Sequence, residues 1–294
     1  MTIPQTDLNA KPDVTGFFDA QSNTISYVVR DPSGRSCAVI DPVMEFDAAA
    51  GRLTFDCADQ IISHIREHDL SLEWIIETHV HADHLSGAPY IQQQLGGRIG
   101  IGEHVQTVQD TFGKIFNEGT EFQRDGSQFD KLFSDGDDYM IGNLPCFALH
   151  TPGHTPACMV HVIGDAAFAG DTLFMPDGGS ARADFPGGDA GQLYDSIQRV
   201  LSLPDQVRLF ICHDYGPGGR AIAWETTIAE QRAANIHVGG GKSRQDFIKF
   251  RTERDAQLAV PKLILPSLQV NMRAGEVPTD ADGNMVLKTP VNKI

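Results

Sequence analysis

The stretch Thr78-His79-Val80-His81-Ala82-Asp83-His84-Leu85 places three imidazoles and one carboxylate within six residues. It follows the apolar run Trp74-Ile75-Ile76, which predicts a strand buried on both faces, and precedes a predicted short helix over residues 88–95. The cluster therefore lies on a strand-to-helix turn, where several side chains can converge. Neutral imidazole and carboxylate are donors that borderline divalent metals prefer. Because four buried polar groups without partners would be costly, the turn predicts a metal site.

Three later segments also bring metal donors to the ends of predicted strands. Thr151-Pro152-Gly153-His154 follows a strand predicted over 147–150, and we expect its glycine to let the backbone approach the metal closely. Gly170-Asp171 ends the second of two paired strands predicted over 158–163 and 166–169, and His213 follows a buried strand over 207–212. The candidate ligands are His79, His81, Asp83, His84, His154, Asp171 and His213.

The order of the predicted elements favours a layered α/β fold. A hairpin is expected over 24–30 and 37–41, and a strand over 98–102. Helices are expected over 57–70, 103–116, 192–203, 221–235 and 243–258. Residues 1–16 are predicted to be an extended lead-in, residues 117–138 a loop around an edge strand, and the Pro-rich tail irregular. We expect a catalytic core over residues 1–238 and an extension over 239–294 that packs on it.

Charge and cysteine usage limit the classes of partner and compartment. The 39 acidic and 23 basic residues give a net charge of −16, which argues against nucleic acid or an anionic membrane as a partner. Five cysteines without a Cys-x-x-Cys pair favour reduced thiols. No apolar run approaches the ~18 residues of a membrane span, and the first residues lack a signal pattern, so we expect a cytoplasmic protein. A homodimer stays open.

The pattern His-x-His-x-Asp-His resembles the signature of the metallo-β-lactamase superfamily. The segments Thr151-Pro152-Gly153-His154-Thr155 and Gly170-Asp171-Thr172-Leu173, and His213, resemble its later motifs in the same order. The resemblance implies an αββα metallo-β-lactamase sandwich, here with a C-terminal extension. It also implies an enzyme that uses a bound metal.

Two kinds of metal centre fit these residues, and ligand type alone does not separate them. In a dinuclear zinc or iron centre, a bridging hydroxide attacks a carbonyl, as in thioester hydrolases resembling glyoxalase II. In a mononuclear centre, His79, His154 and Asp171 form a two-histidine, one-carboxylate face that suits non-haem Fe(II) and O2. A metal-bound sulfide or redox sensor without turnover is a third hypothesis.

Flanking segments resemble the persulfide dioxygenase branch of the superfamily. They are residues 179–185 and 193–197, His213-Asp214-Tyr215 and Asn271-Met272-Arg273. The resemblance implies one Fe(II) per chain, held by His79, His154 and Asp171. It implies oxidation of a small-molecule persulfide, typically glutathione persulfide, by O2 to sulfite and free thiol. The groups that would then orient the ligands from outside are His81, Asp83, His84 and His213. Asp41 either supports this site from below or caps a loop.

Substrate-binding candidates come from the same flanking segments. Arg182 and Arg273 are candidates for substrate carboxylates, because guanidinium groups pair bidentately with carboxylates. Asp184 could fix Arg182, for which a surface ion pair is an equal alternative. Tyr215 either hydrogen-bonds near the iron or packs with a satisfied hydroxyl. Long, Gly-rich loops depart from the animal members of that branch, so coenzyme A or polysulfide also stays open as the sulfur carrier.

Overall fold

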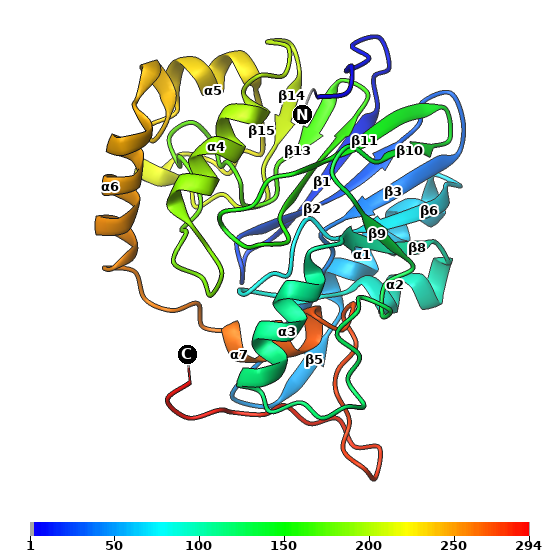
Figure 1. Ribbon diagram of the computed structural model, residues 1–294. Helices are drawn as coiled ribbons and strands as arrows, with labels where there is room; N and C mark the ends of the chain where they lie inside the picture. Colours follow the sequence, from blue (N-terminus) through cyan, green and yellow to red (C-terminus); the bar gives the residue numbers. More distant parts are fainter. Residues whose placement is uncertain (1–2, 294) are drawn as a thin grey trace.

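Two six-stranded sheets pack face to face in the computed structural model, which describes residues 3–293 (Figure 1). The first sheet has the order β1 (Asp13–Asp19), β2 (Thr24–Arg30), β3 (Ser36–Ile40), β6 (Ser71–Ile76), β8 (Arg98–Gly102) and β9 (Lys131–Phe133). The second has the order β10 (Asp138–Ile141), β11 (Leu144–His150), β12 (Met159–Ile163), β13 (Ala166–Phe168), β14 (Arg208–Phe210) and β15 (Glu225–Thr227). From β3 to β9 the strands are parallel, whereas β10 to β13 are antiparallel.

Alternating side chains of the central strands build two different cores. In β3, Val39 belongs to the core under the helices, while Ile40 belongs to the core between the sheets. In β6, Ile75 and Ile76 divide in the same way. Both faces of these strands are therefore buried, as their apolar sequences predict.

Helices cover the outer face of each sheet (Figure 1). On the first sheet lie α1 (Asp56–Glu67), α2 (Ala88–Leu95) and α3 (Val105–Ile115). On the second lie α4 (Ala190–Val200) and α5 (Ile228–Ala234), and α6 (Arg244–Asp255) packs against α4. These layers are those of the αββα sandwich that the sequence predicts.

The segment after residue 238 contacts both halves of the sandwich. Phe247 of α6 joins the core of the second sheet, whereas Leu268 of α7 (Ile264–Asn271) joins the core of the first. α7 also packs against β7 (Leu85–Ser86), which forms a small sheet with β4 (Val43–Asp47) and β5 (Arg52–Thr54). Because β7 directly follows the histidine-rich turn, α7 lies next to the candidate metal site.

Three predicted elements differ from the structure. The tail predicted to be irregular contains α7, which tolerates Pro266 because a proline in the first turn interrupts no helical hydrogen bond. The helix predicted over 221–235 begins only at Ile228, where Thr227 and Glu230 form a capping box, and β15 precedes it. The predicted lead-in overlaps β1, an edge strand that pairs with β2. Among residues 3–293, no helix has the length and apolar character to cross a membrane.

Candidate metal centre

The turn between β6 and β7 is held from below by Asp41. The Asp41 carboxylate accepts hydrogen bonds from the Thr78 backbone N–H (2.7 Å) and hydroxyl (2.8 Å), and it lies 3.0 Å from Nε2 of His81. Because a carboxylate only accepts, His81 donates through Nε2, and its Nδ1 keeps the lone pair. The structure therefore supports the prediction that Asp41 holds the metal-binding turn in place.

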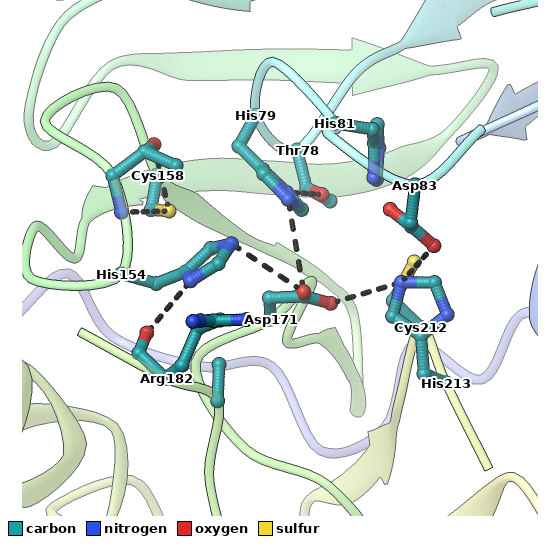
Figure 2. A network of polar contacts seen from close by, with 12 residues as sticks. Thr78, His79, His81, Asp83, His154, Cys158, Asp171, Arg182, Cys212 and His213 are labelled. Atoms are coloured by element: carbon teal, nitrogen blue, oxygen red, sulfur yellow. Dashed lines mark hydrogen bonds and ion pairs between the residues drawn. The ribbon is translucent and has the colours of Figure 1, made fainter. Parts of the chain in front are cut away.

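His79, His154 and Asp171 form the first group of metal donors (Figure 2). Their ligand atoms lie within 4.8 Å of one another. Nε2 of His154 is 3.5 Å and Nε2 of His79 is 3.9 Å from Oδ2 of Asp171. Nδ1 of His154 donates to the backbone carbonyl of Arg182 at 2.8 Å, so Nε2 is free to bind a cation. Three turns far apart in sequence thus supply one face.

A second group consists of His81, Asp83, His84 and His213, again with ligand atoms within 4.8 Å of one another. Nε2 of His213 lies 3.3 Å from Oδ2 of Asp83 and 3.3 Å from Oδ1 of Asp171. Asp171 therefore stands between the two groups, with one oxygen toward each (Figure 2). All seven ligand candidates from the sequence converge on this place.

The buried polar atoms of the cluster test whether a metal fits. Within residues 3–293, six of them lack any hydrogen-bond partner: Nε2 of His79, Nδ1 of His81, Oδ2 of Asp83, Nε2 of His84, Oδ1 of Asp171 and Nε2 of His213. Leaving so many buried polar atoms unpaired would be costly. Coordination to divalent cations would satisfy all six, so the residues fit a metal centre.

Burial also sets the protonation state that metal binding needs. Desolvation, assisted by the neighbouring imidazoles, lowers the pKa of His79 and His81 well below the usual value. Both rings are therefore neutral near pH 7 and have a lone pair to offer. Burial raises the pKa of Asp171, and the neighbouring His213 and His154 oppose that shift.

A cavity of about 1200 Å³ opens over the donors. Asp83, His154, Asp171 and His213 reach its surface. Tyr215 also lines it: this residue is 62% exposed, and its ring stacks on that of His213 with centroids 6.3 Å apart. The cavity is large enough for a small molecule of the size of a short peptide.

The substrate-binding candidates occupy different places. Arg182 lines the cavity, but its guanidinium pairs bidentately with Asp184 at 2.6 and 2.8 Å and donates to the carbonyl of Ala259. Asp184 thus fixes Arg182. Arg273 does not line this cavity: it pairs with Glu118 at 3.0 Å and lies over the ring of Phe122. The sequence predicts that Arg273 binds a substrate carboxylate. In the structure its acidic partner is instead Glu118, in the segment over 117–138.

Sequence reasoning missed other cations on the cavity wall. Arg251 and Arg254 of α6 and Lys262 beyond it all line the cavity. Arg251 is buried in an ion pair with Asp255, but Arg254 and Lys262 are exposed and make no ion pair with another described residue. The sequence marks α6 as a charged helix, but the face that meets the cavity depends on its packing against α4.

Comparisons with known proteins agree with this geometry. The family model described as the metallo-beta-lactamase superfamily matches residues 21–213. A probable metallo-hydrolase from Burkholderia pseudomallei is 51% identical, over 96% of this chain and 99% of its own. Glyoxylase B2 from Dictyostelium discoideum is 46% identical, over 97% of this chain and 99% of its own.

Similarity to persulfide dioxygenases is lower but extends over most of the chain. The human mitochondrial persulfide dioxygenase ETHE1 is 29% identical, over 89% of each chain. The crystal structure of ETHE1 from Myxococcus xanthus superposes with a TM-score of 0.71 at 30% identity, covering 90% of this chain and all of that one. The matched family model, the two layered sheets and the converging donors show that the chain belongs to the metallo-β-lactamase superfamily.

Proposed function

We propose that this protein is a persulfide dioxygenase that holds one Fe(II) on His79, His154 and Asp171. Its substrate would be glutathione persulfide or a related small persulfide, which reacts with O2 and one water molecule to give sulfite and free thiol, the water supplying the third oxygen. The observation that carries the proposal is the two-histidine, one-carboxylate face, which opens onto a cavity with cationic side chains on its wall. The similarity to ETHE1 proteins over most of the chain supports it.

Bound iron would supply a site that accepts sulfur and activates O2, and the protein would hold and orient the reactants. The carbonyl of Arg182 fixes the ring of His154, and Asp41 fixes the turn that carries His79. Because the whole chain carries a charge of −16, an anionic thiol requires local positive charge. Arg254 and Lys262 supply that charge at the cavity.

A dinuclear thioester hydrolase resembling glyoxalase II is the second candidate. It is favoured by the second donor group, whose atoms lie as close together as those of the first. It is also favoured by the names of relatives at 46–51% identity, glyoxylase and metallo-hydrolase. In this alternative Asp171 would bridge two ions, since its two oxygens face the two groups.

One paired assay separates these candidates. Protein purified without oxygen and loaded with Fe(II) is expected to bind about one iron per chain, to consume O2 on addition of glutathione persulfide and to release sulfite. Elemental analysis, an oxygen electrode and sulfite determination would measure this. Cleavage of S-lactoylglutathione by protein with about two metals per chain, without O2 uptake, would instead establish the hydrolase.

Arg254 offers a test of the charged substrate. Arg254→Ala is expected to raise the KM for glutathione persulfide about five- to tenfold and to leave kcat and iron content unchanged, because a charge-assisted contact made before the reaction is lost. Lys249→Ala is the matched control, since Lys249 is an exposed cation on the same helix that does not line the cavity. Equal KM values for the two variants would remove Arg254 from the substrate site.

A further inference from the structure

The three side-chain hydrogen bonds of Asn271, the last residue of α7, go to the metal-binding turn and to β7, which directly follows it. Its Nδ2 donates to the carbonyl oxygens of His81 at 2.9 Å and His84 at 2.8 Å, and its Oδ1 accepts from the backbone N–H of Ser86 at 2.8 Å. Asn271 is only 4% exposed, so these hydrogen bonds are shielded from water. One residue of the C-terminal segment thus holds the turn at two points and the following strand β7 at a third.

The turn needs such a partner because it is irregular. Residues 77–84 form no helix or strand, yet they carry four donors of the two metal groups. Buried backbone carbonyls without a regular ladder must find donors elsewhere. The amide of Asn271 supplies two donors and one acceptor in a fixed plane, which also fixes the spacing between His81 and His84.

The C-terminal end of α7, which carries Asn271, is itself held firmly in the core. Leu268 and Met272, on either side of Asn271, are fully buried in the core beneath the first sheet. Nε2 of Gln109, in α3, donates to the carbonyl of Met272 at 2.9 Å. The end of α7 is therefore held by contacts that do not involve the turn, and Asn271 transmits that rigidity to the metal donors.

We propose that Asn271 is a positioning residue for the metal centre, through which the C-terminal segment sets metal affinity. The proposal needs only a metal bound by this turn, so it goes beyond the choice between dioxygenase and hydrolase. Its chemistry is specific to an amide. An aspartate of the same size could not donate to the two carbonyls and would place a negative charge against them.

Gln269 provides a closely matched control. It lies on the same helix, is fully buried and also makes three side-chain hydrogen bonds to backbone groups. These bonds reach Leu265 and both backbone groups of Lys288, all within the C-terminal segment. Gln269→Ala therefore removes the same number of contacts from α7 without touching the turn.

The test is metal binding by apoprotein, measured by competition with a chelator for Zn(II) and by the visible absorption bands of bound Co(II). Asn271→Ala and Asn271→Asp are expected to weaken Zn(II) binding about 10- to 100-fold, the range found when groups that orient metal ligands are removed, and to alter the Co(II) spectrum. Gln269→Ala should keep the affinity and spectrum of the unaltered protein. Circular dichroism would establish that each variant is folded.

Two results would overturn the proposal. One is unchanged affinity and an unchanged Co(II) spectrum in the folded Asn271 variants. The other is an equal loss in Gln269→Ala, which would show that any weakening of α7 lowers affinity. If Asn271→Ala does not fold, the isosteric Asn271→Asp decides. Because no turnover is measured, failure here is distinct from failure of the proposed dioxygenase reaction.

Discussion

Asp171→Ala is expected to give a folded protein that retains less than about a tenth of its metal and loses activity on the order of a thousandfold or more. Asp171 is the only carboxylate in the group with His79 and His154. Its other oxygen lies 3.3 Å from His213, so its removal damages both donor groups. Neutral imidazoles alone would face a buried divalent cation without a compensating charge on that side.

Asp165→Ala is the control for this variant, because Asp165 is 7% exposed and Asp171 is 8% exposed. Asp165 pairs with Arg208 and is not among the residues that line the cavity. Its loss should lower stability but leave metal content intact, as measured by elemental analysis of dialysed protein. Full metal content in Asp171→Ala would show that the ligand assignment is wrong.

The ligand candidates could be predicted from sequence because each lies at the end of a strand. His154 and Asp171 follow β11 and β13, which flank β12 and are both antiparallel to it, so their carboxyl ends lie at the same edge of the sheet. A short motif at a strand end is therefore enough to predict the position of its metal donor. Local sequence patterns also explain why β2, α2 and β8 begin and end at the predicted residues.

The charged residues on the cavity wall could not be predicted in this way. Arg182 and Arg273 both lie in segments that resemble one enzyme branch, but the direction of a long side chain depends on its partners. Arg182 meets Asp184 two residues away and stays at the cavity, whereas Arg273 meets Glu118, which is remote in sequence. Arg254 reaches the cavity only because α6 packs on α4. Contacts between segments remote in sequence leave no pattern in the local sequence.

Gly153 is a residue for which the structure gives a further reason why glycine is needed. The sequence interpretation was that its missing side chain lets the backbone approach the metal. In the structure Gly153 has φ +136°, and a Cβ placed there would lie 2.2 Å from the backbone nitrogen of Leu193. The close approach is thus to the first turn of α4, where the N-cap residue Asp189 also donates its backbone N–H to the carbonyl of Gly153.

Gly153→Ala is therefore expected to reduce the free energy of unfolding by roughly 3–5 kcal/mol, from backbone strain and forced displacement of α4 together. Urea denaturation of metal-free protein would measure the loss without a contribution from bound metal. Gly136→Ala separates the two causes, because Gly136 also has positive φ, +84°, but no atom lies within 4 Å of its added Cβ. That variant should lose only about 1–2 kcal/mol from the backbone. Equal losses in the two variants would mean that contact with α4 is not what requires glycine at position 153.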